Sequence, residues 1–371
     1  MSVQAVILVG GRGTRLRPLT SNRPKPIVPL VDRPFMAYML EWIASHGITD
    51  VILCCGFLAD SMIEELGDGS AWGVRITWVQ EPEPRGTAGA LWYAEPHLRG
   101  DRFVMLNGDV LTDMDLTVQL AQHERSGARG TLALVPVEDP TAYGLVRLNG
   151  DTTVKGFLEK PEPDEIDTDL ISAGAYVLER SVLDLVPQGR MVSIEREVWP
   201  RLVGDGLHGC VHRGRYWMDI GTPERYLEGT ADILARRVRT RVGERLQEQG
   251  PVDATATVAD DSVVDRASIV DRGATLGSRV VVGSGSVVGP DVTIGDDVIL
   301  QDAVVLEGAT VGTGSRLRDC VIGARARIGA GVVANDAAMV GDEAVVGDGN
   351  VLAGGVRVAT GVTLPDRALS F

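Results

Sequence analysis

The sequence has no excess of basic residues. Its 36 lysines and arginines are outnumbered by 51 aspartates and glutamates, which leaves a formal net charge of −15. Nucleic acids and membrane surfaces are themselves anionic, so binding to either would begin with electrostatic repulsion. The charge balance therefore argues against a general binder of nucleic acid or of membrane. Any basic cluster is expected to be local and to serve a small anion.

Long hydrophobic runs are also missing. The longest apolar stretch near the N-terminus, residues 5–9, is far shorter than the core of a signal peptide, and no stretch approaches a transmembrane span. Cysteine is scarce, and the few present lack the paired spacing of a zinc site: they are Cys54, Cys55, Cys210 and Cys320. We expect reduced, structural thiols in a cytoplasmic protein.

The N-terminal part alternates short apolar runs with helical patterns. At 371 residues the chain exceeds the usual size of a single hydrophobic core, so we expect two domains. Apolar runs fall at residues 5–9, 51–55, 103–107 and 131–137, and helical patterns at residues 35–47, 60–66 and 115–127. This alternation is typical of an α/β fold with a doubly wound parallel sheet, here with a mixed edge near residues 144–158. Ligands of such sheets bind beyond the carboxyl ends of the strands.

The C-terminal third carries a different repeat. From Val252, every sixth residue is aliphatic as far as Leu306; the period slips by one at Val311 and again at Ile322, then continues to Leu364. Hexapeptide repeats of this kind predict a left-handed parallel β-helix, in which the aliphatic residues are buried along the axis of a prism. Between the two parts, residues 223–249 have the pattern of one helix.

A glycine-rich turn follows the first apolar run. Its glycines lack side chains, so backbone N–H groups can approach a phosphate; they are Gly10, Gly11 and Gly13. The spacing is not that of a P-loop, and the third glycine of a dinucleotide motif would fall on Leu16. Arg15 adds a cation, and the prolines on both sides of Lys25 restrict where its ammonium points. A nucleoside triphosphate would fit this turn.

The segment GGRGTRLRPLTSNRPKP, residues 10–26, resembles the signature of the sugar-1-phosphate nucleotidyltransferases, the NDP-sugar pyrophosphorylases. Further segments agree in order: EPRGTAGAL at 83–91, LNGDV at 106–110, FLEKP at 157–161, SAGAYVL at 172–178, SIEREVWP at 193–200 and YWMDIGTPERY at 216–226. The resemblance covers essentially the whole chain, because several members also carry a C-terminal β-helix. It implies a Rossmann-like catalytic domain over residues 1–229, a linker helix over 230–250 and the hexapeptide-repeat β-helix over 251–371.

The resemblance also implies the reaction and its residues. A sugar phosphate attacks the α-phosphorus of a nucleoside triphosphate in line and pyrophosphate leaves, so the protein must mainly neutralise charge and align two anions. Arg15, Lys25 and Asp109 are the predicted catalytic residues. Asp109 and Asp219 would hold Mg²⁺, which prefers one or two carboxylates with phosphate oxygens and water. The predicted nucleotide contacts are Leu8, Gly10, Gly11, Gly13, Thr14, Gln80, Glu81, Gly86 and Thr87.

The sugar phosphate is assigned to a second group of residues. Glu159 and Lys160 resemble the sugar-hydroxyl acceptor and the sugar-phosphate cation of the family. The whole predicted set is Gly144, Glu159, Lys160, Ser172 and Gly174. Related enzymes commonly have Asn-Ala-Gly where this chain has Ser172-Ala173-Gly174. Serine is shorter and offers a hydroxyl in place of an amide, so the effect of Ser172 on sugar binding stays open.

The choice of base depends on one of two neighbouring residues. The base-reading position of the family lies five residues before Gly86, at Glu81, with Gln80 beside it. A carboxylate suits the N1–H and N2–H donors of guanine, whereas a glutamine amide suits thymine or uracil. Glu81 favours GTP, and a slip of one residue would favour dTTP or UTP. The segments most resemble mannose-1-phosphate guanylyltransferases, so we expect synthesis of GDP-mannose. A glucose-1-phosphate thymidylyl- or uridylyltransferase is the alternative.

The sequence argues against two other classes of function. An acyltransferase in a β-helix needs a general base, usually histidine, yet every histidine precedes Val252: His46, His97, His123, His208 and His212. A non-catalytic, nucleotide-sugar-binding regulatory homologue should have lost a phosphate cation or a metal carboxylate, whereas all of those predicted are present. We expect the β-helix to assemble a homo-oligomer instead, through outward valines such as Val281, Val287 and Val305.

Overall fold

The computed structural model describes residues 3–370 except residues 12 and 57. The backbone packs as two units: Met1–Gly11 with Met36–Trp217 form the first, and Arg12–Phe35 with Met218–Phe371 form the second. By its contacts, the segment after the first strand therefore belongs with the C-terminal part of the chain. The predicted boundaries at residues 229 and 250 follow the linear sequence and stay a prediction.

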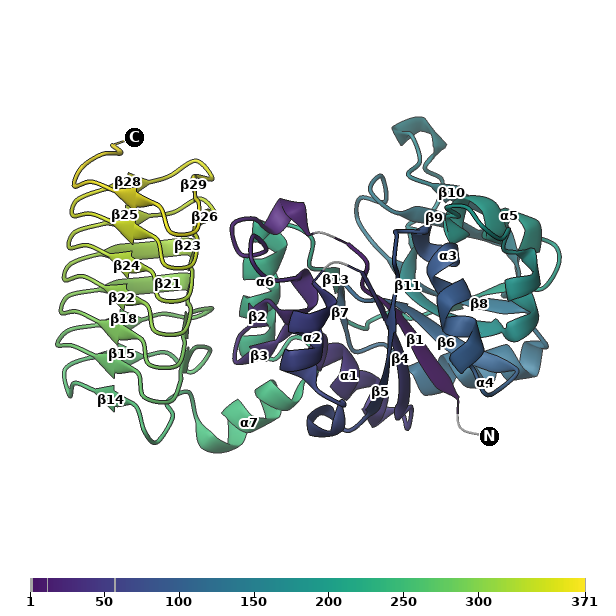
Figure 1. The fold of residues 1–371 in the computed structure, drawn as a ribbon, viewed down its shortest axis with the longest axis horizontal. Coiled ribbons are helices and arrows are strands. Elements are labelled where there is room, and N and C mark those ends of the chain that lie inside the picture. Colours follow the sequence, from purple (N-terminus) through teal and green to yellow (C-terminus); the bar gives the residue numbers. More distant parts are fainter. Residues whose placement is uncertain (1–2, 12, 57, 371) are drawn as a thin grey trace. The chain divides into compact units, whose positions relative to one another are not determined.

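The first unit is built on a mixed β-sheet, drawn with its helices in Figure 1. In spatial order its strands are β10 (Val154–Glu159), β9 (Gly144–Leu148), β11 (Leu170–Glu179), β6 (Arg102–Asn107), β1 (Gln4–Leu8), β4 (Asp50–Cys55) and β5 (Arg75–Gln80). β8 (Gly130–Pro136) also pairs with β11, and β12 (Leu207–Val211) pairs with β8. The strands β1, β4, β5 and β6 are parallel, which confirms the predicted parallel core.

Strand β11 departs from the predicted parallel order. It runs antiparallel to both β6 and β8, so the apolar run at 131–137 does not continue the parallel sheet beside β6. Almost every residue of β11 is buried, and a strand buried on both faces can lie inside a sheet. The predicted mixed edge is confirmed, because β9 and β10 pair antiparallel.

The helices of the first unit lie where the periodicity predicts them. α1 (Phe35–Ser45), α2 (Ala59–Leu66) and α4 (Leu116–Ser126) match the three helical patterns, and the chain adds α3 (Gly86–Ala94) and the short α5 (Trp199–Leu202). Asp115 caps α4 by accepting from the Val118 amide at 3.1 Å, and Gly127 ends the helix at φ 62°. The shorter elements of the unit include β7 (Val110–Thr112) and the π-helical turn η7 (Ile194–Val198).

The predicted linker helix is wrong in detail, because two helices replace one. These are α6 (Pro223–Leu234) and α7 (Arg241–Gln249). Arg236, between them, has φ 60°, a conformation that an α-helix does not contain. The Thr240 hydroxyl then accepts from the Gly243 amide at 3.1 Å and starts α7.

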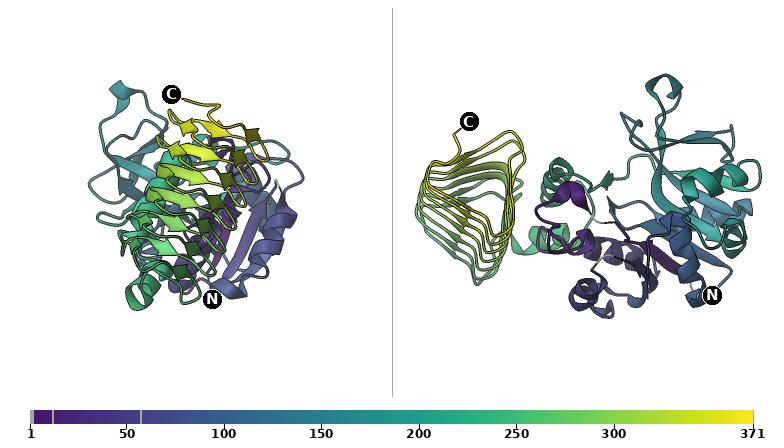
Figure 2. Two further views of the ribbon diagram at one scale, coloured as in Figure 1. Left: turned by 90° about the vertical axis from the view of Figure 1, so that its left-hand side faces the viewer. Right: turned by 45° about the horizontal axis from the view of Figure 1, so that its top comes forward.

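The second unit contains the predicted parallel β-helix, whose stacked coils are visible in both views of Figure 2. Thr257 pairs with Thr275 and Thr275 with Thr293, so a full coil takes 18 residues, or three hexapeptides. One column of strands is β14 (Thr257–Val258), β17 (Thr275–Leu276), β20 (Thr293–Ile294), β22 (Thr310–Val311), β24 (Arg327–Ile328), β27 (Val345–Val346) and β30 (Thr363–Leu364). A second column is β15 (Val263–Val264), β18 (Val281–Val282), β21 (Ile299–Val305), β23 (Arg316–Ile322), β25 (Val333–Ala334) and β28 (Val351–Leu352). The third column is β16 (Ile269–Val270), β19 (Val287–Val288), the C-terminal ends of β21 and β23, β26 (Ala338–Val340) and β29 (Arg357–Val358).

The predicted register of the repeat is wrong at one coil. Val305, rather than Leu306, occupies the inward position, because it pairs with Val288 and Ile322 and shares the core with them. The corner at Asp302 is one residue short, and Asp302 turns it at φ 48°, a conformation that aspartate tolerates. The period therefore slips before Val305.

The third column has an outward face that is nevertheless buried. Its outward apolar residues are at most 2% exposed: Ile269, Val287, Val304, Val321 and Met339. Helix α6 packs over this face and contacts β21 and β23. Val287 and Val305 are therefore not the exposed valines that we expected, since Val287 is covered and Val305 points inward. Val281, in the second column, is 39% exposed as predicted.

Candidate active site

The glycine turn after β1 is open where a phosphate would approach. Gly10 and Gly11 are both exposed, and a Cβ added to Gly11 would meet no atom within 4 Å. Leu8, at the end of β1, accepts a hydrogen bond from the Gly108 amide at 2.9 Å. The first unit therefore presents exposed backbone at the carboxyl edge of its parallel strands, as the sequence predicts for an α/β sheet.

Gly13 has a structural role in the second unit. Its φ of 59° lies in the left-handed region, and an added Cβ would lie 3.1 Å from Lys25 Cβ and 3.2 Å from Thr20 Cγ2. The Thr20 hydroxyl donates to the Gly13 carbonyl at 2.8 Å. Gly13 thus lets the turn lie directly against the lysine of the Pro-Lys-Pro sequence.

The two predicted phosphate cations both belong to the second unit. Lys25 is 9% exposed, opens a 3₁₀ turn (η2, Lys25–Ile27), and holds its Nζ 6.0 Å from the centre of the Phe35 ring. Arg15 lies in a similar turn (η1, Thr14–Leu16) and is exposed. The prolines on either side of Lys25 and the buried Leu16 beside Arg15 fix the two backbones.

Gly221, which sequence reasoning missed, lies between a predicted cation and a predicted metal ligand. A Cβ at this position would be 2.9 Å from Arg15 Nη2 and 3.1 Å from Asp219 Oδ2. Asp219 ends β13 (Trp217–Asp219), and its carbonyl accepts from the Gly221 amide at 3.0 Å. Gly221 therefore leaves room for the guanidinium of Arg15 and the carboxylate of Asp219. Its presence in the YWMDIGTPERY segment was the sequence signal for this role.

Glu81 and Gln80 have different surroundings. Gln80, the last residue of β5, is exposed, whereas Glu81 is 9% exposed, with Oε1 3.6 Å from the position of a Cβ on Gly10. Burial raises the pKa of the Glu81 carboxyl, and a hydrogen bond from the Arg85 backbone offsets part of that rise. Of the two candidates, Glu81 is the one beside the glycine turn.

The predicted sugar residues come together at the end of β10. A Cβ on Gly144 would lie 2.5 Å from Phe157 Cζ and 3.1 Å from Glu159 Oε2, so Gly144 lies directly against both side chains. Burial, and next the charge of Glu195, raise the pKa of Glu159. Lys160 is exposed and has φ 54°, with its amide donating to the Tyr143 carbonyl at 3.0 Å. Such strain in a non-glycine residue is often found at functional sites.

Ser172 and Gly174 lie on the neighbouring strand β11. The Ser172 hydroxyl donates to the Tyr176 hydroxyl at 3.2 Å, which gives it a partner within its own strand. Gly174 has φ 73°, and an added Cβ would lie 3.0 Å from Asn107 Nδ2. Gly174 therefore permits the close approach of β11 to the end of β6, next to Asp109.

Glu195 is a second residue that sequence reasoning missed. Its Oε2 accepts from the Thr87 hydroxyl at 2.9 Å and from the Ser193 hydroxyl at 2.7 Å, while the Ile194 amide donates to Thr87 Oγ1 at 2.9 Å. Gly86, at φ 75°, leaves no room for a Cβ, which would be 2.5 Å from the Val192 carbonyl oxygen. Thr87, predicted to contact nucleotide, thus joins α3 to the π-helical turn. Glu195 lies within the SIEREVWP motif, but the motif alone did not indicate that Glu195 binds Thr87.

The carboxylates suit a metal held partly by substrate. Asp109 is half-buried at the carboxyl end of β6, and Gly108 before it has no room for a side chain. Across the described residues, no three His, Cys, Asp or Glu side chains gather to form a protein metal cage. One or two carboxylates completed by phosphate oxygens and water are the ligands that Mg²⁺ prefers. The donors present therefore fit a divalent metal of this kind.

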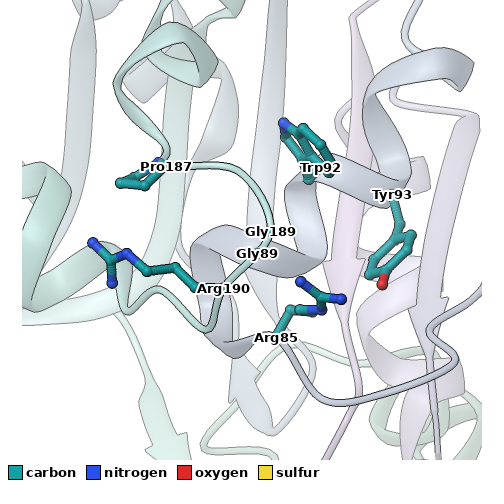
Figure 3. A pocket seen from close by; sticks show the side chains of 7 residues that line it. All are labelled: Arg85, Gly89, Trp92, Tyr93, Pro187, Gly189 and Arg190. Carbon is teal, nitrogen blue, oxygen red and sulfur yellow. The ribbon is translucent and has the colours of Figure 1, made fainter.

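A hollow elsewhere in the first unit does not involve the predicted residues. It measures about 110 Å³ and is drawn in Figure 3, where its lining residues are Arg85, Gly89, Trp92, Tyr93, Pro187, Gly189 and Arg190. Its arginines are already paired, Arg85 with Glu83 and Arg190 with Glu197.

Within the described part of the chain, no helix combines the length and apolar character needed to cross a bilayer.

Comparison with known proteins agrees with both parts of the chain. Residues 4–236 match the family model described as nucleotidyl transferase, and residues 264–369 match the GMPPB C-terminal domain. The chain is 44% identical over 256 residues to the mannose-1-phosphate guanylyltransferase of Mycobacterium tuberculosis, covering 67% of this chain and 70% of the relative. It is 40% identical over 239 residues to the mannose-1-phosphate guanyltransferase of Schizosaccharomyces pombe, covering 63% and 65%.

A solved structure shows the same relationship in three dimensions. The crystal structure of HddC from Yersinia pseudotuberculosis complexed with GMP-PN aligns with a TM-score of 0.53 at 27% identity. The alignment covers 61% of this chain and 97% of HddC. Because the nucleotidyl transferase model spans more than half of the sequence, and the glycine turn, cations and carboxylates lie within that span, the chain belongs to the nucleotidyl transferase family.

Proposed function

We propose that the chain transfers GMP from GTP to mannose 1-phosphate, giving GDP-mannose and pyrophosphate. The observation that carries this proposal is the similarity to two guanylyltransferases that use mannose 1-phosphate, at 44% and 40% identity. The position of Glu81 supports it independently, because a buried carboxylate beside the glycine turn suits the guanine edge.

The residues have separate tasks in the transfer. An oxygen of the sugar phosphate forms a bond to the α-phosphorus of GTP, the bond from that phosphorus to the β-phosphate oxygen breaks, and pyrophosphate leaves with the electron pair. Arg15 and Lys25 would neutralise the triphosphate. Asp109 and Asp219 would hold Mg²⁺, which supplies further neutralisation of the phosphate oxygens when bound.

The two substrates would be recognised by two groups of side chains. Glu81 would accept from guanine N1–H and N2–H. Glu159 would accept from a sugar hydroxyl, and the exposed ammonium of Lys160 would pair with the sugar phosphate. Burial and the neighbouring charge of Glu195 raise the pKa of Glu159, and a sugar hydroxyl that donates to the carboxylate would stabilise its charged form.

Turnover across a panel of substrates tests this assignment. Purified protein would be incubated with GTP, dTTP, UTP, ATP or CTP, each with mannose 1-phosphate or glucose 1-phosphate, and the nucleotide sugar identified by mass spectrometry. We expect the highest kcat/KM with GTP and mannose 1-phosphate. A preference for dTTP or UTP with glucose 1-phosphate would establish the alternative enzyme. Binding without turnover in every combination would identify a regulatory homologue.

We also propose that the chain forms a homo-oligomer through the second column of the β-helix. Its outward residues Val263, Val281 and Ile299 are 61%, 39% and 40% exposed and stand in register on successive coils. A continuous apolar column of this kind is a surface that partner contact would bury.

The free, buried cysteines Cys54, Cys55, Cys210 and Cys320 agree with the proposed cytoplasmic location.

A further inference from the structure

The signature segment, defined as residues 13–35, is tied to the β-helix by a buried ion pair. The Arg23 guanidinium donates to Asp342 Oδ2, and the Asn22 amide donates to the same oxygen at 3.4 Å. The side chain of Asp342 is only 1% exposed, against 22% for Arg23. Asp342 Oδ1 accepts from the Ala324 amide, 2.9 Å away on the preceding coil. One carboxylate therefore joins the signature segment to two successive coils.

A second contact reaches the residue assigned to the triphosphate. Arg357 Nη1 donates to the backbone carbonyl of Arg15 at 2.9 Å. Arg357 stands in register with Met339 in the third column, so it leaves the β-helix on the face that carries the buried apolar residues. The side chain of Arg357 thus connects the third column to the signature segment.

Both contacts act on the segment that carries Arg15. The Arg15 side chain is exposed, and its guanidinium lies against Gly221 beside Asp219. Leu16 and Leu19 are buried and anchor the turn from one side. Moving a substrate-aligning group by about 1 Å can reduce turnover by roughly a hundredfold, so the position of the Arg15 carbonyl matters to the chemistry.

We propose that Asp342 and Arg357 are positioning residues for nucleotidyl transfer, through which the β-helix holds the signature segment and aims Arg15 at the triphosphate. The inference rests on the proposed function, because that function assigns Arg15 to the triphosphate. It gives the β-helix a task in the reaction that is separate from assembly.

Kinetics of full-length variants test the positioning role. In Arg357→Met we expect kcat/KM for GTP to fall roughly three- to tenfold, as expected for a lost hydrogen bond, with KM for GTP raised and KM for mannose 1-phosphate unchanged. Arg357→Lys keeps a donor and should restore much of the loss. Asp342→Asn keeps an acceptor for the Ala324 amide, and combining it with Arg23→Met should be no worse than either change alone. Arg327→Met removes an exposed arginine on the first column and should match the wild type.

Hydrogen–deuterium exchange gives a readout that does not depend on activity. Peptides within residues 13–24 should exchange faster in Arg357→Met and Asp342→Asn than in the wild type or Arg327→Met. Unchanged exchange, or faster exchange with unchanged GTP kinetics, would overturn the positioning role while leaving the proposed function intact. Equal defects for GTP and the sugar phosphate would overturn it as well.

If the wild type turned over no substrate pair, the proposed function would fail. Calorimetry with GTP and Mg²⁺ would then decide the inference, and it would be overturned if Arg357→Met bound GTP as the wild type does or if neither bound.

Discussion

The carboxylate of Glu81 lies beside Gly10, with Oε1 3.6 Å from the position that a Cβ on Gly10 would occupy. Gly10 belongs to the open glycine turn and Glu81 follows β5, so two residues 71 positions apart in the sequence meet at the carboxyl edge of the sheet. The neighbouring Gln80 is exposed. This arrangement makes base selection the first property to test.

Replacing Glu81 with Gln should weaken the use of GTP. The change keeps the shape but turns one acceptor oxygen into a donor, which leaves a guanine N–H without a partner; the loss is about 1.5–3 kcal/mol, or roughly tenfold or more in kcat/KM. Use of dTTP or UTP should fall less, or rise. Gln80→Ala is the control and should keep the GTP preference. An altered preference in Gln80→Ala with none in Glu81→Gln would mean that Gln80 reads the base.

Replacing Glu159 with Gln should change the pH dependence of stability. Burial and the charge of Glu195 raise the folded-state pKa of Glu159, so between its unfolded and folded pKa values the folded state binds more protons than the unfolded state. Stability of the wild type should therefore fall as pH rises through that window. Glu159→Gln removes this loss, so its Tm relative to the wild type should be higher at pH 7 than at pH 4.

The same variant should use sugar phosphate less well, because an amide accepts from a hydroxyl more weakly than a carboxylate does. Glu138→Gln, at an exposed position, is the control for general effects of lost charge. A Tm difference between Glu159→Gln and the wild type that does not vary with pH would contradict the assigned pKa shift.

Activity should require a divalent metal held by Asp109 and Asp219. Asp109→Asn and Asp219→Asn should each abolish detectable turnover while circular dichroism and Tm remain close to the wild type. Mg²⁺ should restore activity after treatment with EDTA. Asp260→Asn, at an exposed position of the β-helix, should behave as the wild type. Full activity in excess EDTA would rule out the metal.

Gly221→Ala should damage activity far more than stability. The added Cβ would lie 2.9 Å from Arg15 Nη2 and 3.1 Å from Asp219 Oδ2, and both are ends of flexible side chains that can move aside. We expect kcat/KM to fall about tenfold or more because Arg15 is displaced, with Tm changed by only a few degrees. Gly150→Ala, where a Cβ meets no atom within 4 Å, is the matched control. Equal kinetics in the two variants would show that Arg15 needs no such clearance.

Val281→Asp and Ile299→Asp should lower the oligomeric state measured by light scattering. Both residues are about two-fifths exposed in the single chain, 39% and 40%, so a charge should disturb assembly more than folding. Thr293→Asp, exposed on the first column, should leave the mass unchanged. A wild-type protein that is monomeric at micromolar concentration would contradict assembly altogether.

The sequence by itself determined the family, the parallel core and the β-helix. Each of these depends on a local pattern: a contiguous run of glycines and cations before Lys25, apolar runs at 5–9, 51–55 and 103–107, and an aliphatic residue at every sixth position from Val252. Local patterns report backbone conformation and burial directly, because strand, helix and coil each have their own period. The motifs also selected Glu81 and Glu159 as candidate site residues, and their roles stay predictions.

Only the tertiary structure decided which distant residues meet. Nothing in the sequence near Asp342 distinguishes it from the other aspartates of the repeat, yet its burial against Arg23 links the β-helix to the signature segment. Glu195 accepts a hydrogen bond from Thr87, and Gly221 lies against Arg15, although more than a hundred residues separate the members of each pair. Val287 likewise has an outward position in the repeat, but α6 covers its face. Such contacts depend on how complete elements pack, and packing between elements far apart in the chain leaves no period in the sequence.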